Sequence, residues 1–195
     1  MNRSHVVSVA LVGVFAVVVS ACGGSTSNDT RVLDAAKIPD KLVVTSPEFA
    51  DNGAIPRANT CDGPGTPPTI SWTAVPHDTK EVAVVVDDPD AAKGPFLHWL
   101  VIGLAAKAGS VPSRAPGVIQ LDNTGGTLGW TPPCPPAGSL HHFHFSVYAL
   151  SDYVCADNGD ATNGPGCAAP ASVQALTQIT GSAIAKGVLV GTYKR

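Results

Sequence analysis

The stretch that decides the fold is VAVVVDDPDAAKGPFLHWLVIGL, residues 82–104. It holds two runs of β-branched and large apolar residues, 82–88 and 98–104, separated by a loop with two prolines. Valine and isoleucine favour strands, and proline and glycine interrupt them. We therefore predict two neighbouring antiparallel strands, with residues 88 and 98 at the same end of a sheet.

Similar runs occur on both sides of this stretch. Segments rich in glycine and proline separate them, and the chain of 195 residues has 20 glycines, 17 prolines and only 14% charged residues. Short apolar runs separated by glycine- and proline-rich segments are typical of an all-β domain. The other predicted strands are 42–46, 69–72, 118–121, 143–150 and 188–193. The one predicted helix is 172–185, with Ser172 as its cap and Gly187 after its end.

The N-terminus is typical of an exported protein. Arg3 precedes an apolar run at 6–19, and Ser20 and Ala21 follow it. This order predicts a secretory signal peptide over 1–21. Its apolar run is shorter than the roughly 20 apolar residues that a membrane-spanning helix needs. Residues 19–22, Val-Ser-Ala-Cys, resemble a bacterial lipobox, in which the cysteine is lipidated. The alternative is an ordinary signal peptide with a chance cysteine.

On the lipobox interpretation, Cys22 becomes a lipidated first residue of the mature chain. Residues 22–40, in which Gly-Gly-Ser-Thr-Ser follows the cysteine, then form a flexible tether. The folded domain is predicted over 41–195. We expect the protein to be anchored to the cell membrane on its extracytoplasmic face.

Four further cysteines lie in what would be an oxidising compartment, where they allow three pairings. A bond between Cys155 and Cys167 is favoured because it closes a loop rich in Asn, Gly and Asp. Cys61 and Cys134 are then the second pair. The sequence leaves open whether Cys61 or Cys134 stays free.

Three ionisable residues stand at the ends of predicted strands. Side chains alternate between the faces of a strand, so Asp88 closes an apolar face made by residues 82, 84 and 86. By the same alternation, His98 opens a face with 100, 102 and 104, and His141 opens one with 143, 145, 147 and 149. If these strands are antiparallel neighbours, the three polar groups meet at one rim of the core. The alternative is that they merely terminate strands.

Such a convergence suits a small anionic ligand. Polar groups at the rim of an apolar core are typical of a ligand pocket. Imidazoles can donate hydrogen bonds to an anion, and a carboxylate can hold a histidine in one tautomer. No metal ion or cofactor is needed for this kind of binding.

The same residues belong to a recognisable pattern. Asp88-Pro89-Asp90-Ala91 and His98-Trp99-Leu100-Val101 resemble the first signature of the phosphatidylethanolamine-binding proteins, also called Raf-kinase-inhibitor-like proteins. A second signature is similar to residues 129–138, GWTPPCPPAG, followed by HHFHF at 141–145. Residues 60–63, 68–72 and 189–193 look like the opening and closing segments of the family's bacterial branch.

The resemblance runs from about residue 42 to the C-terminus. It implies a mainly β fold, a sandwich of two antiparallel sheets with a C-terminal helix. It also implies a non-catalytic pocket for a phosphate-type anion or phospholipid headgroup, formed by Asp88, His98, Pro135 and His141, with Asp90 bracing the loop. The family often places tyrosine where this chain has Phe143, so one hydroxyl donor is missing.

Other functional classes have weaker support. The formal net charge is −3 and no Lys/Arg cluster occurs, which argues against a nucleic-acid partner. His142 and His144 form an H-x-H pair, but the further ligands of a metal enzyme are missing. Cys134 lies between prolines, and no G-x-S-x-G motif supports a hydrolase. A protein-interaction module, such as a protease or kinase inhibitor, remains open as an alternative use of the same pocket region.

Overall fold

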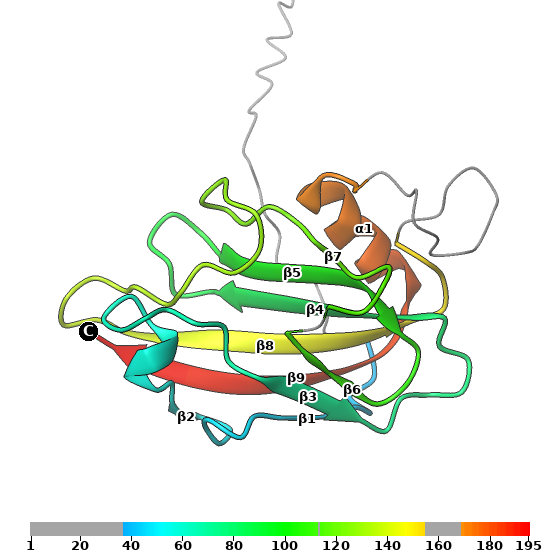
Figure 1. The fold of residues 1–195 in the computed structure, drawn as a ribbon, viewed down its shortest axis with the longest axis horizontal. Helices are drawn as coiled ribbons and strands as arrows, with labels where there is room; N and C mark the ends of the chain where they lie inside the picture. The colour runs from blue at the N-terminus through cyan, green and yellow to red at the C-terminus, as the bar shows by residue number, and fades with distance from the viewer. Residues whose placement is uncertain (1–36, 113, 155–168) are drawn as a thin grey trace, which may run out of the picture.

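A computed structural model describes residues 37–112, 114–154 and 169–195. Two sheets pack face to face, as Figure 1 shows, with strand orders β2-β9-β8-β4-β5-β7 and β1-β3-β6. The prediction of a mainly β sandwich with one helix near the C-terminus is confirmed. The strands are β1 Val43–Thr45, β2 Gly53–Ala54, β3 Ile70–Thr73, β4 Glu81–Asp88, β5 Phe96–Ala105, β6 Gly109–Val111, β7 Ile119–Gln120, β8 Leu140–Leu150 and β9 Ala183–Lys194. The described elements also include the 3₁₀ turn Arg57–Asn59 and helix α1, Ser172–Ser182.

The central strand β4 is buried on both faces. Every one of its eight residues is buried, which is why the run reads as nearly continuous valine. Val82, Val84 and Val86 face the core between the two sheets. Ala83 and Val85 instead join a second core on the other side of the large sheet.

Helix α1 covers that second face. Ala175, Leu176 and Ile179 pack against the apolar side chains of β4, β5 and β8, and Figure 1 shows the helix lying beside the large sheet. The predicted start of the helix is correct, although Ser172 does not cap it: its hydroxyl donates to the carbonyl of Asp122 at 2.5 Å.

The predicted end of the helix is wrong. The helix stops at Ser182, and Ala183 already has extended backbone as the first residue of β9. Residues 183–194 pair antiparallel with β8 along nearly its whole length. Sheet hydrogen bonds and burial of Ala185 in the inner core therefore override the weak local preference for helix.

The predicted faces of β5 are also wrong. The register skips His98 between the pairs Val86–Trp99 and Asp87–Leu97, so His98 is the extra residue of a β-bulge. Leu100 and Ile102 consequently face the helix side and not the side of His98. The bulge turns the His98 ring toward the inner core instead, where it contacts Phe143.

The disulfide between Cys61 and Cys134 is present. Cys155 and Cys167 lie outside the described residues, as do Cys22 and the predicted signal peptide. Of the segment predicted as a tether, residues 37–40 are described: Ile38 packs on the second core and Asp40 bridges to Lys186. Within the described ranges, no helix is long and apolar enough to cross a membrane.

Candidate functional site

A buried hydrogen bond joins two of the predicted site residues across neighbouring strands. Nδ1 of His141 lies 2.7 Å from Oδ2 of Asp88, and both side chains are at most one-tenth exposed. The antiparallel register of β4 and β8 pairs Asp87 with His144, which places residue 141 beyond the end of β4. A carboxylate oxygen can only accept, so the Nδ1–H of His141 is the donor when Asp88 is ionised.

His98 is held by a second hydrogen bond, to the backbone of the following loop. Its Nδ1–H donates to the carbonyl of Thr131 at 2.7 Å, and the backbone N–H of Thr131 donates back to the carbonyl of His98 at 2.9 Å. Burial lowers the pKa of His98, and the bond to Thr131 opposes that shift only in part. The ring is therefore mainly neutral at pH 7.

Phe143 lies between the two imidazoles. Its ring centroid is 5.2 Å from that of His98 and 6.4 Å from that of His141, and its side chain is fully buried. The sheet thus brings the two rings to one apolar platform beside Asp88. A tyrosine here would add a hydroxyl, so the platform of this chain is less polar than the family resemblance leads one to expect.

In their neutral forms the two histidines have the same tautomer. Both use Nδ1–H for an internal hydrogen bond, so the neutral form of each ring has a lone pair on Nε2. A lone pair repels a fully ionised anion. Nε2 becomes a donor only when the ring gains a proton, which makes anion binding at this place dependent on proton uptake.

Asp90 and Pro135 have supporting positions. The Asp90 carboxylate accepts hydrogen bonds from the backbone N–H and from Nδ1 of His142, at 2.8 and 2.7 Å, which ties the loop after β4 to the start of β8. The hydrogen bonds from His142 hold the pKa of Asp90 below its ordinary value. Pro135 is buried directly after Cys134, so the disulfide fixes its place relative to residue 61.

The loop that carries Thr131 is organised by a residue that the sequence analysis missed. Asn123 is buried, and its amide donates to Thr127, Gly129 and Thr131. Its carbonyl oxygen accepts from the backbone of residues 125 and 127. The signal in the sequence is the Asn-Thr-Gly-Gly turn at 123–126, because asparagine commonly bonds to nearby backbone in turns.

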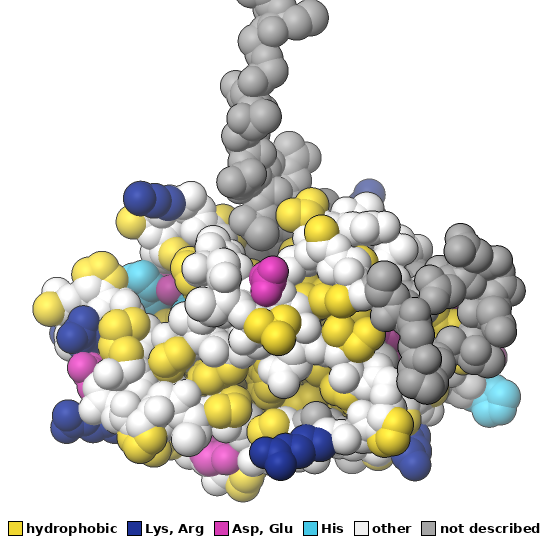
Figure 2. All heavy atoms as spheres, turned by 45° about the horizontal axis from the view of Figure 1, so that its top comes forward, with side chains coloured by type: hydrophobic (Ala, Val, Ile, Leu, Met, Phe, Trp, Pro, Cys, Tyr) yellow, Lys and Arg dark blue, Asp and Glu magenta, His cyan; other side chains and the backbone are white. Residues whose placement is uncertain are grey.

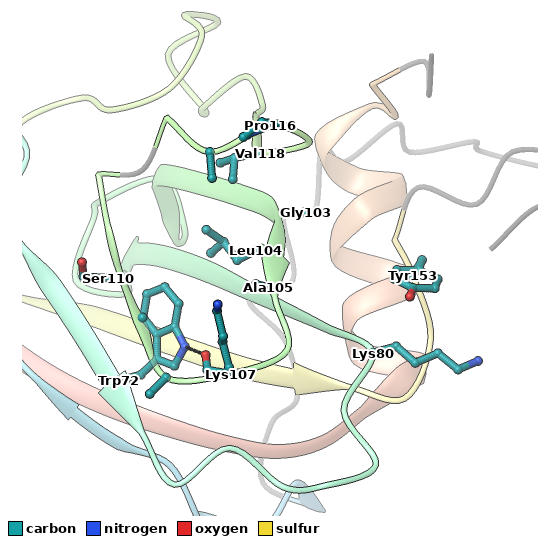
Figure 3. A pocket seen from close by; sticks show the side chains of 13 residues that line it. Trp72, Lys80, Gly103, Leu104, Ala105, Lys107, Ser110, Pro116, Val118 and Tyr153 are labelled. Atoms are coloured by element: carbon teal, nitrogen blue, oxygen red, sulfur yellow. Dashed lines mark hydrogen bonds between the residues drawn. The ribbon is translucent and has the colours of Figure 1, made fainter. Parts of the chain in front are cut away.

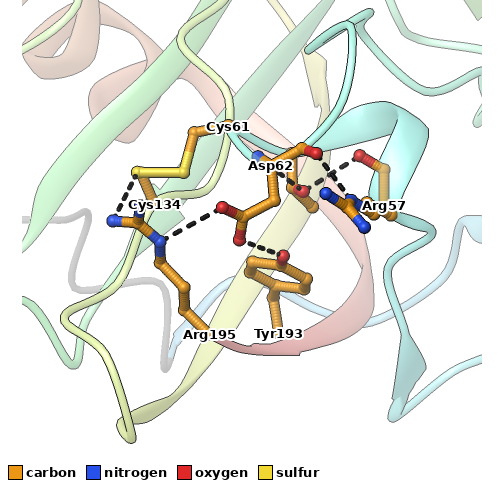
Figure 4. A network of polar contacts seen from close by, with 7 residues as sticks. Arg57, Cys61, Asp62, Cys134, Tyr193 and Arg195 are labelled. Carbon is orange, nitrogen blue, oxygen red and sulfur yellow. Dashed lines mark hydrogen bonds and ion pairs between the residues drawn. A yellow bond between two sulfur atoms is a disulfide. The ribbon is translucent and has the colours of Figure 1, made fainter.

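A polar network closes the same end of the sandwich from the other side (Figure 4). Asp62, next to the disulfide, accepts from the Tyr193 hydroxyl at 2.6 Å and from Nε of Arg195 at 3.2 Å. The hydrogen bond from Tyr193 is the main reason that the pKa of Asp62 is lowered. Tyr193 is the cross-strand partner of His141 in β9, so the network fixes the strand on which the site depends.

Asp87 faces the opposite side of the sheet. Among the described residues, its Oδ2 is the one buried side-chain oxygen or nitrogen without a hydrogen-bond partner. The nearest cationic candidate, Nδ1 of His144, is 3.9 Å away. Burial, with a smaller contribution from the neighbouring Asp88, raises the pKa of Asp87 to about 7.

The H-x-H pair is not gathered into a metal centre. His142 bonds to Asp90 and His144 lies near Asp87. In the part of the chain that the structure describes, no group of three or more His, Cys, Asp or Glu side chains is placed to hold a metal ion. On the face shown in Figure 2, Lys and Arg side chains are scattered around the rim and form no continuous basic area.

The fold and the buried Asp–His pair thus define a two-sheet sandwich with a small polar site at one end. A family model described as Phosphatidylethanolamine-binding protein matches residues 45–194. The chain belongs to this family.

Relatives agree with this assignment. The UPF0098 protein Rv1910c of Mycobacterium tuberculosis (strain H37Rv) is 40% identical over 158 residues, which covers 80% of this chain and 71% of that protein. A protein of the same strain named "Putative lipoprotein LppC" is 36% identical over 185 residues, covering 88% and 87%.

Solved structures show the same fold. The structure of CT736 from Chlamydia trachomatis matches with a TM-score of 0.67 and 30% identity, covering 80% of this chain and 99% of that one. E. coli YbcL, described as a member of the mammalian PEBP family, matches with a TM-score of 0.67 and 26% identity over the same shares.

The buried Asp87 carboxyl should make the stability of the protein depend on pH. Its pKa is raised from 3.8 to about 7 in the folded state. Between about pH 4 and pH 7, the Asp87 carboxyl is therefore ionised in the unfolded chain but protonated in the folded protein. The free energy of unfolding consequently falls as pH rises through this range. Asp87→Asn removes this loss. We expect equal stability of wild type and variant at pH 4, and a gain for the variant at pH 8 of at most about 4 kcal/mol, since a tenfold change in proton affinity is about 1.4 kcal/mol. Urea unfolding at both pH values measures it. A variant that is less stable than wild type at pH 8 would contradict it.

Proposed function

We propose that the protein is an exported, lipid-anchored member of the family that binds phosphate-type anions at Asp88, His98 and His141 without chemically changing them. The observation that carries the proposal is the buried bond of 2.7 Å between His141 and Asp88, beside a second imidazole on the same phenyl ring. The ligand class includes free phosphate, phosphorylated small molecules and phospholipid headgroups.

Three features support binding over catalysis. The Asp88 carboxylate accepts from His141 and from the Asp90 backbone, so both of its oxygens serve to hold the site. Cys134, the one candidate nucleophile of the sequence analysis, is in a disulfide. The groups left to meet a ligand are imidazole nitrogens, which suit hydrogen bonding to an anion.

Support for the anchor comes from two sources. The sequence at 19–22 resembles a lipobox, and a relative of 36% identity carries the name "Putative lipoprotein LppC". A protein held at a membrane by lipid would meet phospholipid headgroups at high local concentration. This makes a headgroup the first ligand to test.

Binding should depend on His141. In calorimetric titrations with phosphate and with phosphoethanolamine, His141→Ala is expected to weaken binding at least tenfold, because it removes one imidazole and leaves the Asp88 carboxylate buried without its partner. His77→Ala is the matched control, since His77 is fully exposed and far from β8 in sequence. The proposal would be overturned if the wild type released no heat with either ligand. It would also be overturned if His141→Ala and His77→Ala bound the ligands with equal affinity.

Binding should also strengthen as pH falls. Burial lowers the pKa of His98, and a neutral imidazole that already donates through Nδ1 must gain a proton at Nε2 before it can donate there. Sulfate is the suitable probe because it keeps its charge, whereas a phosphate monoester has a second pKa of about 6. We expect the sulfate affinity to rise up to tenfold per pH unit for each proton taken up between pH 8 and 5.5. Calorimetry in two buffers of different ionisation enthalpy counts the protons; binding without proton uptake at pH 7.5 argues against this site chemistry.

The anchor is tested by Cys22→Ala in the full-length chain. The substitution removes the thiol that would carry the lipid, so we expect the protein to leave the membrane fraction and to lose labelling by a palmitate analogue. Ser20→Ala is a control that leaves the cysteine in place. Unchanged membrane partition and labelling of Cys22→Ala would show that the protein is not anchored by lipid at Cys22.

A further inference from the structure

A hollow lies at the other end of the sandwich from Asp88. It is bounded by Lys80, just before β4, and by the end of β5, and its volume is about 410 Å³. Figure 3 shows it between the end of β5, the turn into β6 and the segment before β7. Its lining includes Trp72, Lys80, Leu104, Lys107, Pro116 and Val118.

The backbone around the hollow is held in place by specific contacts. Gly103 has φ +75° at the second bulge of β5, and a Cβ there would come within 2.0 Å of the carbonyl oxygen of Gly117. The indole N–H of Trp72 donates to the carbonyl of Lys107 at 2.9 Å and fixes the turn between β5 and β6. Gly109 lies against the same indole ring, where a Cβ would be 2.9 Å from Cζ2. The hollow is therefore built by the fold and is not a gap between loose loops.

The lining combines an apolar wall with an uncompensated positive charge. Leu104, Pro116 and Val118 supply apolar surface, and no Asp or Glu is among the lining residues. Lys80 forms an ion pair with Asp152 at 3.5 Å and points outward in Figure 3. Lys107 has no ion pair within the described ranges, and Figure 3 shows its side chain directed into the hollow beside Trp72.

We propose that this hollow binds a small amphiphilic carboxylate, independently of the anion site at Asp88. The carboxylate pairs with the Lys107 ammonium, and the apolar body lies along Leu104, Pro116 and Val118. A volume of about 410 Å³ is within the range of small-molecule sites, roughly 300–1,000 Å³, which commonly join an apolar wall to a few polar groups. An alcohol of the same chain length keeps the apolar contacts but lacks the charge.

Decanoate, used below the concentration at which it forms micelles, is the probe. Titration calorimetry gives its affinity, and ¹H–¹⁵N spectra report whether the amides of residues 103–110 and the Trp72 indole shift. We expect decanol to bind at least tenfold more weakly than decanoate. Lys107→Gln is expected to lose at least tenfold in decanoate affinity, while Lys80→Gln, which removes the outward-pointing lysine, stays within twofold of wild type.

Two more variants locate the binding. Ala105 is exposed at the end of β5, so Ala105→Trp fills the hollow without disturbing a core and should abolish decanoate binding while phosphate binding persists. His141→Ala should leave decanoate binding unchanged. No decanoate binding by wild type, equal binding by Lys107→Gln, or loss of decanoate binding in His141→Ala would each overturn the proposal; the last result would assign the ligand to the anion site instead.

Discussion

The hydrogen bond between His141 and Asp88 depends on the antiparallel register of β4 and β8, and the rest of the site depends on that bond. A shift of one residue would move every side chain of β8 to the other face of the sheet. His141 and Phe143 would then point to the helix side, and His142 would face the inner core. The register is fixed by burial, because Phe143, Phe145 and Val147 must enter the core between the sheets.

The loops around this end of the sandwich serve to hold the two imidazoles. Thr131 positions His98, and Asn123 positions Thr131 through its buried amide. The disulfide joins Cys134, beside Pro135, to Cys61. Asp62, next to Cys61, accepts a hydrogen bond from Tyr193 of the last strand, β9. Burial of a carboxylate and two imidazoles costs free energy, and these cross-links offset the tendency of the loops to open and let water reach the pair.

Alternation of apolar residues was sufficient to predict β4 and β8 with their faces, because both strands are regular and their inner faces are apolar. The same reasoning failed for β5, where two bulges change the face at residues 98 and 103. A bulge depends on pairing with the neighbouring strand, which no local pattern contains. His98 nevertheless lies beside Phe143, because the bulge turns its ring to the inner side.

Long-range competition explains the remaining differences. Residues 183–185 continue the helical pattern of α1, but pairing with β8 draws them into β9. The roles of Asn123, Asp62 and Arg195 depend on loops that meet only in the folded chain, so no local sequence pattern could predict which residues they contact. Asp87 follows the apolar alternation of its strand, and its unpartnered carboxyl could be found only once its surroundings were known.

The central claim is that His98 and His141 donate through Nδ1 and become anion donors by gaining a proton at Nε2. Long-range ¹H–¹⁵N correlation spectra of ¹⁵N-histidine protein, without and with sulfate at pH 7, test it most directly. We expect the Nδ1–H tautomer for both neutral rings, and protonation of both nitrogens of at least one ring when sulfate binds. Neutral rings that carry their one proton on Nε2 and not on Nδ1 would contradict it. So would spectra of both rings that do not change when sulfate is added.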